Sequence, residues 1–478
     1  MTPTTTMQVQ PIVADVAVIG AGTAGLAAYH AAKTAGKRAL LIEAGPYGTT
    51  CARVGCMPSK LLIAPAEAAH AVDRFGAFGL ALDGPVRIDG KAVMARVKRE
   101  RDRFVGFVTR GVDTIPPADR ILGRARFVDA TTLLVDEHLT IKAARVVIAT
   151  GSSPSHPAAW KALGDRLLTS DDVFEWDDLP ASVAVFGPGV IGLELGQALH
   201  RLGVRVKVFG RGGGIGPLAD PALIAEAHRV FGAEFYLDID ANAQVVRDGD
   251  AVVVTYRGLD GASHVECFDY LLATTGRTPN VQGLRLENTP VTLRANGVPD
   301  YDRFTLQCGA TTIFIAGDAN HDVPILHEAA DEGRIAGANA ARFPDVRPGL
   351  RRAGIGVVFS DPQIAVIGGG YAAAREVPHV IGAVSFEDQG RSRVMLRNQG
   401  MLHVYAEIGS GRFLGAEMLG PDAEHIGHLL AWALQMKLTI AQMLEMPIYH
   451  PVVEEGLRTA LRDAQQALDQ VAGTLAAA

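Results

Sequence analysis

Residues 15–25 read DVAVIGAGTAG. The first five residues form a short apolar run typical of a β-strand, and the next six have the spacing GxGxxG. Residues 26–33 predict a helix, and residues 37–42 predict a second strand that ends at Glu43. The glycines of the turn are Gly20, Gly22 and Gly25. In this context they allow a tight turn, a close approach to a pyrophosphate and close packing of helix on strand. The stretch therefore predicts a dinucleotide site, with the phosphates at the helix N-terminus and Glu43 accepting from both ribose hydroxyls.

The same pattern occurs a second time in the chain. Residues 182–186 predict a strand, residues 193–199 a helix and residues 204–209 the following strand. The glycines between the first strand and the helix are Gly187, Gly189 and Gly192. The two turns lie too far apart for a solenoid repeat, so we expect two nucleotide-binding domains, each with its own ligand.

The two predicted sites differ at the position where an acidic residue would bind the ribose. Glu43 lies 18 residues after Gly25, and the same step after Gly192 leads to Gly210, which is followed by Arg211. The second site thus lacks the carboxylate that would repel a 2′-phosphate and has a guanidinium that could bind one. We predict NADP(H) rather than NAD(H) at this site. The alternative is that Arg211 is a solvated residue of a glycine-rich loop.

Composition limits the class of protein. The chain has 478 residues, 48% hydrophobic and 20% charged, which is ordinary for a globular protein of roughly three domains. Only four residues are cysteines, which excludes a disulfide scaffold and favours a reducing compartment; Cys267 and Cys308 are expected to be ordinary buried cysteines. The net charge of −7 disfavours a nucleic-acid partner. The N-terminus has no signal-peptide pattern, and no apolar run has the length of a membrane span, so we predict a cytoplasmic protein.

The other two cysteines are close in sequence. Cys51 and Cys56 lie five residues apart, with Gly48 and Gly55 nearby. A regular helix would separate them by about 7.5 Å along its axis, beyond the roughly 7 Å limit for a disulfide, so a bridge requires distorted backbone. A loop this short stabilises little, which favours a reversible dithiol/disulfide couple over a structural bridge or incidental buried cysteines. The ligands nearby are too few for zinc, and we predict no metal site.

On these motifs and four more, the chain resembles the FAD-dependent pyridine nucleotide–disulfide oxidoreductases, the family of dihydrolipoamide dehydrogenase, glutathione reductase and mercuric reductase. The resemblance covers nearly the whole chain. The markers that occur in the family's order are Gly20–Gly25, Cys51 with Cys56, residues 149–151 (ATG), Gly187–Gly192, residues 273–280 (ATTGRTPN), residues 315–318 (IAGD) and residues 450–455 (HPVVEE).

The resemblance implies which residues meet the cofactors. Asp318 would bind the ribityl chain of FAD, and Lys60 would pair with Glu194 beside the flavin N5. Cys56 would be the cysteine nearer to the flavin, and Cys51 the one that exchanges with substrate. The further cofactor-binding residues that it implies are Thr50, Thr150, Gly151, Gly276, Arg277 and Gly317.

A histidine and a glutamate complete the predicted chemistry. We expect His450 and Pro451 to precede a helix, with Pro451 acceptable at its first turn. Glu455 lies on that helix and could reach back to the imidazole of His450. A histidine oriented by a carboxylate near a dithiol is a general acid–base unit. The resemblance implies that this pair serves the cysteines of the other subunit, and hence a homodimer with each active site built from two chains.

The predicted fold class is α/β, with two Rossmann-like domains for FAD and NAD(P) and a C-terminal α+β dimerisation domain. The expected segments are 1–155 for the first part of the FAD domain, 156–275 for the NAD(P) domain, 276–347 for the return to the FAD domain and 348–478 for dimerisation.

Three departures from the family pattern bear on the substrate. Thr49 replaces the second glycine of the usual Gly-Gly-Thr-Cys, Arg53 replaces an asparagine, and His425 stands where dihydrolipoamide dehydrogenases often carry glutamate. An added cation at Arg53 would favour a thiolate in the couple. These changes leave the redox core intact but count against the usual lipoamide substrate.

Exchange with a small-molecule or lipoyl-protein dithiol, as in dihydrolipoamide dehydrogenase, is the leading hypothesis for the activity. An NADPH-dependent reductase of another disulfide or small oxidant, similar to glutathione reductase, is the alternative. A mercuric reductase is disfavoured because residues 467–478 contain no vicinal cysteine pair. A non-catalytic redox-sensing flavoprotein is disfavoured by the intact pair of His450 and Glu455.

Overall fold

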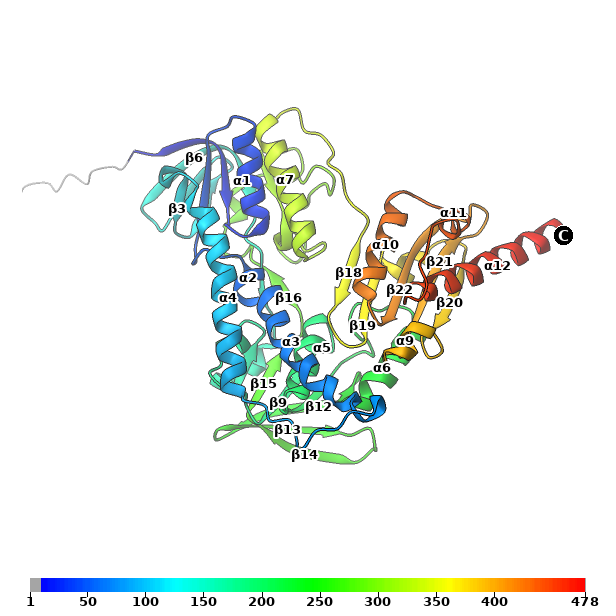
Figure 1. The fold of residues 1–478 in the computed structure, drawn as a ribbon. Coiled ribbons are helices and arrows are strands. Elements are labelled where there is room, and N and C mark those ends of the chain that lie inside the picture. Colours follow the sequence, from blue (N-terminus) through cyan, green and yellow to red (C-terminus); the bar gives the residue numbers. More distant parts are fainter. Residues whose placement is uncertain (1–9, 478) are drawn as a thin grey trace, which may run out of the picture. The chain divides into compact units, whose positions relative to one another are not determined.

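The computed structural model describes residues 10–477 (Figure 1). The chain divides into two compact units. Unit 1 comprises Met1–Pro58, Lys98–Ser155 and Arg277–Arg351, and unit 2 comprises Ser59–Val97, His156–Gly276 and Arg352–Ala478. Two boundaries fall inside helices, α3 (Cys56–Ala71) and α4 (Gly90–Asp113). Residues 59–97, which we expect in the first FAD segment, therefore cluster with unit 2.

Unit 1 is built on a seven-stranded sheet of order β3-β2-β1-β6-β5-β4, with β17 paired to β6. Its strands are β1 (Ile12–Ile19), β2 (Ala39–Glu43), β3 (Arg120–Leu122), β4 (Ala125–Asp129), β5 (Thr132–Val135), β6 (Leu139–Ile148) and β17 (Ile313–Ile315). The central strand β1 is parallel to β2 and β6. Val16 and Val18 pack into one apolar cluster, while Ala17 and Ile19 pack into another on the opposite face. Burial on both faces explains the uninterrupted apolar run of the sequence.

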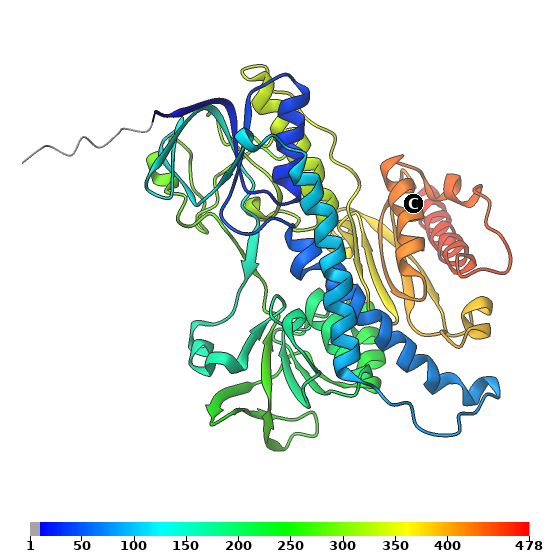
Figure 2. The same ribbon diagram turned by 60° about the vertical axis from the view of Figure 1, so that its left-hand side comes forward.

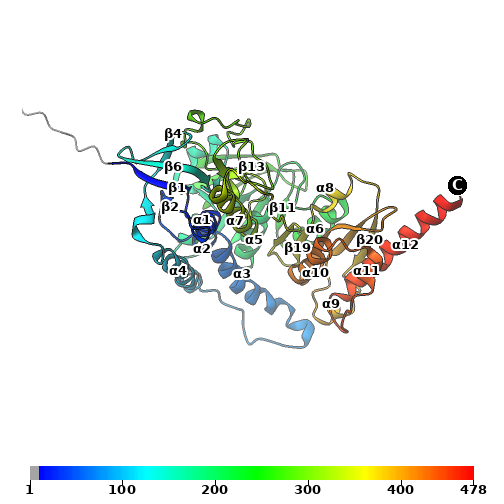
Figure 3. The ribbon, with the colours of Figure 1, turned by 90° about the horizontal axis from the view of Figure 1, so that it is seen from above.

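Two helices of unit 1, α1 (Thr23–Thr34) and α7 (Leu326–Arg342), lie side by side (Figures 1 and 3). Their approach depends on glycine, because a Cβ on Gly333 or Gly337 would lie 2.2 Å from the carbonyl oxygen of Ala24 or Ala28, respectively. The smaller elements of this unit are α2 (Thr50–Val54), the two-stranded pair β7 (Ser152–Pro154) with β16 (Arg277–Pro279), and the 3-10 helix Gly317–Asn320.

Unit 2 contains a second parallel sheet, of order β11-β10-β9-β15-β8. Its strands are β8 (Leu167–Thr169), β9 (Ser182–Phe186), β10 (Arg205–Phe209), β11 (Tyr236–Asp238) and β15 (Tyr270–Ala273), and its helices are α5 (Val190–Arg201) and α6 (Pro221–Glu234). An antiparallel sheet accompanies it, made of β12 (Ala243–Asp248), β13 (Ala251–Arg257) and β14 (Ser263–Phe268).

The C-terminal part of unit 2 is a five-stranded antiparallel sheet of order β18-β19-β22-β21-β20. Its strands are β18 (Ile355–Val358), β19 (Gln363–Ile367), β20 (His379–Ser385), β21 (Met401–Glu407) and β22 (Phe413–Gly420). The helices are α8 (Gly370–Ala374), α9 (Gly390–Val394), α10 (Ala423–Gln435), α11 (Ile440–Leu444) and α12 (Glu455–Ala477). In Figure 2, α10 (orange) and α12 (red) lie against this sheet, with which they share an apolar core.

The predicted fold class is confirmed: a mixed α/β sheet, antiparallel only at β4 and β5, and a parallel α/β sheet are followed by an α+β part. Helix α12 begins at Glu455, so His450 and Pro451 precede it, as predicted. Among the described residues, no helix is both long and apolar enough to cross a bilayer.

The prediction that Cys267 is buried is wrong, whereas Cys308 is buried as expected. Cys267 lies on β14, the edge strand of the three-stranded sheet, and its side chain is exposed. An edge strand of a sheet with one solvated face alternates buried and exposed side chains, and Cys267 falls at an exposed position.

The contact between α1 and α7 gives a stability prediction. Replacing Gly337 with alanine should destabilise unit 1 by about 1–3 kcal/mol, because the new methyl group would overlap the Ala28 carbonyl. The control is Gly111→Ala, on α4 in the same unit, where a Cβ meets nothing within 4 Å; this change should leave stability equal or raise it by about 0.4–1 kcal/mol. Thermal release of FAD, followed by flavin fluorescence, reports the midpoint. Equal midpoints for the two variants would contradict the packing argument.

Candidate active site

The first glycine turn has the geometry of a phosphate cradle. A Cβ on Gly20 would lie 2.3 Å from the Ala149 carbonyl oxygen, and one on Gly25 would lie 1.8 Å from the Gly20 carbonyl oxygen. Gly22, the N-cap of α1, differs because a Cβ there would meet nothing within 4 Å. Gly20 and Gly25 are thus required by the chain itself, while Gly22 leaves open space at a helix N-terminus, where a pyrophosphate fits.

The side chain of Glu43, at the end of β2, is held by two backbone N–H groups. Its two carboxylate oxygens accept hydrogen bonds from the N–H of Ala21 at 2.7 Å and of Gly45 at 2.9 Å. A carboxylate has about four lone-pair positions, so acceptor capacity remains for ribose hydroxyls. The binding of a ribose by Glu43 stays a prediction.

A buried hydroxyl without a partner lies beside the same turn. Thr150 follows β6, and among the described residues its Oγ1 is buried with no hydrogen-bond partner. Such a group costs free energy unless a ligand satisfies it. Together with the open space at Gly22, it shows that the residues around this turn fit FAD.

Asp318 lies in the 3-10 helix that follows β17. Its Oδ2 accepts a hydrogen bond of 2.8 Å from Ser152 Oγ, which in turn accepts one of 2.8 Å from Arg277 Nε. The backbone N–H of Gly317 donates to Glu332 Oε2 at 2.7 Å. Sequence analysis missed Ser152 and Glu332. The only signal for Ser152 was its place directly after the ATG motif.

The second glycine turn repeats the geometry of the first. A Cβ on Gly187 would lie 2.5 Å from the Thr274 carbonyl oxygen, and one on Gly192 would lie 1.9 Å from the Gly187 carbonyl oxygen. A Cβ on Gly189 would again meet nothing within 4 Å. Thr274 Oγ1 closes the turn with contacts of 2.8 Å to the carbonyl oxygens of Phe186 and Gly187.

The end of β10 is where an acid would bind the second ribose. A Cβ on Gly210 would lie 2.6 Å from the Ile239 carbonyl oxygen, so the local packing excludes any larger side chain. Arg211 is exposed, and within the described part of the chain no hydrogen bond or ion pair occupies its guanidinium. The position thus holds an unneutralised cation and no carboxylate.

The cysteine pair lies where a helix is interrupted. Cys51 lies on α2, Cys56 begins α3, and Gly55 between them has φ −123° and ψ −120°. A Cβ on Gly55 would be 3.1 Å from the Cα of Cys51. The distorted backbone that a contact between the cysteines requires is therefore present. Both are thiols in this structure, Cys51 half-buried and Cys56 exposed.

The two thiols interact directly. A hydrogen bond to Cys56, together with burial, raises the pKa of the Cys51 thiol well above its ordinary value. The contact thus disfavours loss of the Cys51 proton. The predicted division of labour, with Cys56 nearer to the flavin and Cys51 toward the substrate, stays a prediction.

Two of the departures from the family pattern lie beside this pair. Thr49 has φ 56° and ψ 151°, close to a region that only glycine adopts readily. Its Oγ1 caps α2 by accepting from the Ala52 N–H at 3.3 Å. Arg53 donates to the Pro46 carbonyl oxygen at 3.4 Å, so its guanidinium is directed toward the 46–48 loop. The third departure, His425, is exposed in the first turn of α10.

Lys60 and Glu194 form the ion pair that the resemblance implies. Lys60 Nζ lies 2.9 Å and 2.8 Å from the two carboxylate oxygens of Glu194, whose side chain is 5% exposed. Phe359, which sequence analysis did not identify, contacts both residues of the pair. Its backbone N–H donates to Glu194 at 3.0 Å, and its ring lies 4.4 Å from Lys60 Nζ. The place of this pair beside the flavin N5 stays a prediction.

His450 and Glu455 also meet as predicted. His450 Nδ1 lies 2.9 Å from Glu455 Oε1, and the Val452 N–H donates to Oε2 at 3.3 Å. These hydrogen bonds, first from His450 and then from Val452, lower the pKa of Glu455 below its usual value. Glu455 is therefore ionised at neutral pH and fixes the orientation of the imidazole, whose side chain is 79% exposed.

Four further predicted cofactor residues lie at turns or at element ends. They are Thr50, the exposed first residue of α2; Gly151 and Gly276, with φ 68° and 121°; and Gly317, with φ 69°. The positive φ values explain why glycine occupies the last three positions.

Comparison with known proteins identifies relatives over nearly the whole chain. A profile described as pyridine nucleotide-disulphide oxidoreductase matches residues 14–333, and a profile for the dimerisation domain of the same group matches residues 355–461. The mercuric reductase of Acidithiobacillus ferrooxidans is 31% identical, over 94% of this chain and 83% of that protein. The dihydrolipoyl dehydrogenase of Halobacterium salinarum is 29% identical, over 96% of this chain and 98% of that protein.

Solved structures agree with this fold. LpdA from Mycobacterium tuberculosis superposes with a TM-score of 0.79 at 25% identity, over 94% of this chain and 99% of that chain. The HOCl-induced flavoprotein disulfide reductase RclA from Escherichia coli gives 0.78 at 21% identity, over 95% and 99%. The likeness to RclA concerns the fold alone.

The raised pKa of Cys51 can be tested by alkylation of the reduced protein. In Cys56→Ala the hydrogen bond is lost, so the pKa of Cys51 should fall toward its ordinary value and its reaction with iodoacetamide should shift to lower pH. Below the pKa, each unit of decrease raises the thiolate fraction about tenfold. Mass spectrometry of Cys51 across a pH series gives the midpoint, and the exposed Cys267 serves as internal reference. An unchanged midpoint would rule out the hydrogen bond as the cause.

Proposed function

The chain belongs to the pyridine nucleotide–disulphide oxidoreductase family, and on that basis we propose that it exchanges electrons between a small dithiol of the dihydrolipoamide type and NADP, through bound FAD and the pair Cys51 and Cys56. The observation that carries the proposal is the contact of these two thiols across the interrupted helix. The dihydrolipoyl dehydrogenases among its relatives, at 29% identity, supply the substrate class.

The residues of this chain can carry out the thiol chemistry with protons and electrons in balance. His450 takes the proton of the first substrate thiol, and the resulting thiolate attacks Cys51 Sγ. The bond between Cys51 and Cys56 breaks, and Cys56 leaves as a thiolate. The second substrate thiol attacks its own first sulfur, the mixed disulfide breaks, and Cys51 leaves with the second proton. The substrate has then lost two electrons and two protons, and the cysteine pair has gained the electrons.

The pKa values agree with this distribution of protons. The raised pKa of Cys51 suits a sulfur that ends the exchange protonated. The lowered pKa of Glu455 keeps a carboxylate next to His450, which orients the ring and stabilises its charged form after proton uptake. The reverse sequence reduces a disulfide substrate.

FAD, when bound, supplies the two-electron carrier between the nicotinamide and the cysteine pair. The residues that would hold it are those of the first turn with Glu43, Thr150 and Asp318. Gly22 leaves the space for the pyrophosphate, Thr150 Oγ1 gains a partner, and Asp318 is held in place by Ser152.

The nucleotide preference rests on Gly210 and Arg211. Close packing against Ile239 prevents a carboxylate at position 210, and the guanidinium of Arg211 is exposed and unpaired among the described residues. A 2′-phosphate would meet a free cation there, and the carboxylate at the same loop, Asp240, is occupied by the N–H of Gly212 at 2.7 Å. The same observation favours the second candidate function, an NADPH-dependent reductase of another disulfide or small oxidant, because NADPH commonly serves reduction.

A shared active site is supported by exposed apolar side chains in the C-terminal part of the chain. The chain carries the dimerisation domain of its family. Trp432, Met436 and Tyr449 in that part of the chain are 69%, 71% and 80% exposed. Large apolar side chains this exposed are typical of surfaces that a second subunit covers. We therefore propose that the pair His450 and Glu455 serves the cysteines of the other subunit.

Anaerobic half-reactions test the proposed substrates. NADPH should bleach the flavin absorbance faster than NADH does, and lipoamide should reoxidise the reduced protein at least about tenfold faster than glutathione disulfide, since it fits the proposed exchange. Faster reoxidation by glutathione disulfide would favour the second candidate. Oxidation of NADPH supported only by Hg(II) would overturn both and favour the activity for which three of the relatives are named.

A matched pair of variants isolates the nucleotide argument within the same experiment. Arg211→Ala should lower kcat/KM for NADPH about 10- to 100-fold, the worth of a charge-assisted hydrogen bond, and leave NADH unaffected. Arg257→Ala removes an exposed arginine of β13 and should change neither. Equal effects of the two variants would remove the support for NADP.

Hybrid dimers test the shared site. His450→Gln and Cys51→Ser homodimers should each be inactive with lipoamide. A heterodimer purified with two different tags should recover about half of the wild-type activity per dimer, because one of its two sites has neither substitution. If each site were built from one chain, the heterodimer would be as inactive as its parents.

A further inference from the structure

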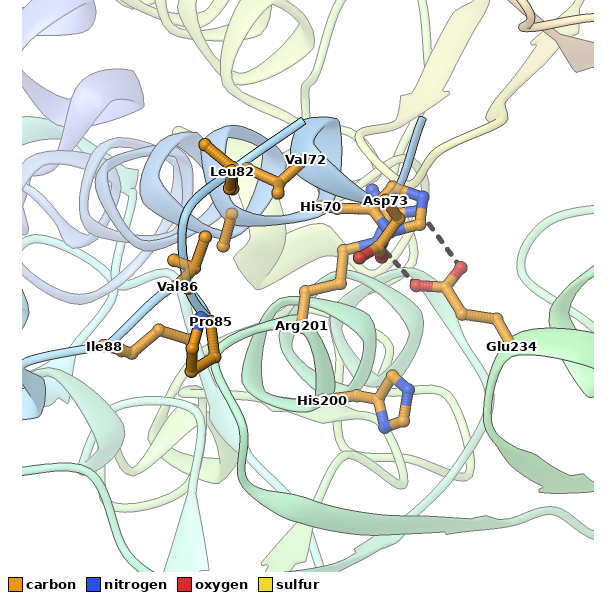
Figure 4. Close-up of a pocket in the computed structure, with 12 residues that line it drawn as sticks. His70, Val72, Asp73, Leu82, Pro85, Val86, Ile88, His200, Arg201 and Glu234 are labelled. Atoms are coloured by element: carbon orange, nitrogen blue, oxygen red, sulfur yellow. Dashed lines mark hydrogen bonds and ion pairs between the residues drawn. The ribbon is translucent and has the colours of Figure 1, made fainter. Parts of the chain in front are cut away.

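A pocket in unit 2 is lined by none of the residues assigned above to the cofactors or to the cysteine chemistry. Its volume is about 570 Å³, within the range of small-molecule sites. The end of α3, the 79–89 loop and the C-terminal ends of α5 and α6 surround it. Figure 4 shows apolar side chains gathered on one side of this pocket and polar side chains on the other.

The apolar side comes mainly from the 79–89 loop. Leu82, Val86 and Ile88 line the pocket and remain 48%, 47% and 37% exposed. A hydrocarbon group placed against them would remove apolar surface from water, which is favourable in proportion to the area covered. This side of the pocket therefore suits an aliphatic ligand.

Arg201 lines the polar side but has little capacity left for an anion. Its Nε and Nη2 donate to Glu234 at 2.5 Å and 3.0 Å, and its Nη1 and Nη2 donate to Asp361 at 3.2 Å and 3.3 Å. Four of its five N–H groups are thus accounted for. Two carboxylates already surround its single charge, so the region around Arg201 is not cationic.

Asp73 is the charged lining group with capacity left. Its Oδ2 lies 2.9 Å from His70 Nδ1, and its side chain is 72% exposed. The other histidine of the pocket, His200, is kept from adding a positive charge, because burial lowers its pKa. The polar side thus offers one carboxylate with free lone pairs and no free cation among the lining residues.

We propose that this pocket binds a small aliphatic amine, with its hydrocarbon chain against Leu82, Val86 and Ile88 and its ammonium group at Asp73. A primary aliphatic amine is protonated at neutral pH, and its ammonium form donates three hydrogen bonds. This suits the Asp73 carboxylate, whose one hydrogen-bond partner among the described residues is His70. The site is separate from the dithiol chemistry, so the proposal does not depend on the proposed substrate.

Three probes of equal chain length test both halves of the proposal on the FAD-loaded full-length protein. Hexylamine, hexan-1-ol and hexanoate differ only in the charge of the head group, and saturation-transfer NMR titrations give their affinities. Hexylamine should bind saturably and about three- to tenfold more tightly than hexan-1-ol, as for an ion pair that solvent reaches, and hexanoate should bind most weakly.

Variants locate the binding. Asp73→Asn should reduce the affinity for hexylamine to that of hexan-1-ol and leave hexan-1-ol unchanged, and Val86→Asn should weaken both. Asp83→Asn removes an exposed carboxylate of the same loop that does not line the pocket, and it should change neither. Equal or tighter binding of hexanoate, no saturable binding of hexylamine, or an Asp73→Asn variant that binds hexylamine unchanged would each overturn the proposal.

Discussion

Both nucleotide sites depend on a backbone contact that only glycine allows. A Cβ on Gly25 would lie 1.8 Å from the Gly20 carbonyl oxygen, and a Cβ on Gly192 would lie 1.9 Å from the Gly187 carbonyl oxygen. Each helix therefore begins directly against its own turn, at the carboxyl end of a parallel strand. In unit 1 the neighbouring strand ends bring further groups that we predict to bind the ligand to the same edge of the sheet, because parallel strands point their carboxyl ends the same way. Glu43 is the last residue of β2, Thr150 follows β6, and Asp318 comes after β17.

The cysteine pair depends on a second local constraint, the break between α2 and α3. A continuous helix would keep Cys51 and Cys56 apart, whereas the backbone at Gly55 turns α3 so that the two thiols meet. The backbone of this segment is strained at Thr49, because a β-branched residue there holds a conformation typical of glycine. The local backbone conformation thus brings the two thiols into contact, and this contact raises the pKa of Cys51.

Longer-range polar contacts hold the second nucleotide site. The loop that carries Arg211 ends at Asp220, the N-cap of α6. Glu417, on β22 and fully buried, accepts from the N–H groups of Ala219 and Asp220 at 3.0 Å each. Asp220 lies 2.7 Å from His403 Nδ1, and although its burial acts in the opposite direction, the hydrogen bond to His403 lowers the pKa of Asp220. The C-terminal sheet therefore takes part in positioning a loop of the nucleotide domain.

The amino-acid sequence alone determined the two glycine turns, the acid at Glu43, its absence at Gly210 and the pairing of His450 with Glu455. These features are local, since the atoms that decide them lie within a few residues or within one strand–turn–helix unit. The tertiary structure decided the rest. It placed Ser152 between Arg277 and Asp318, put the Phe359 N–H on Glu194 and left Cys267 exposed on an edge strand. It also formed the pocket at Asp73. Each of these depends on segments far apart in the chain meeting in space, and neither periodicity nor spacing along one segment carries that information.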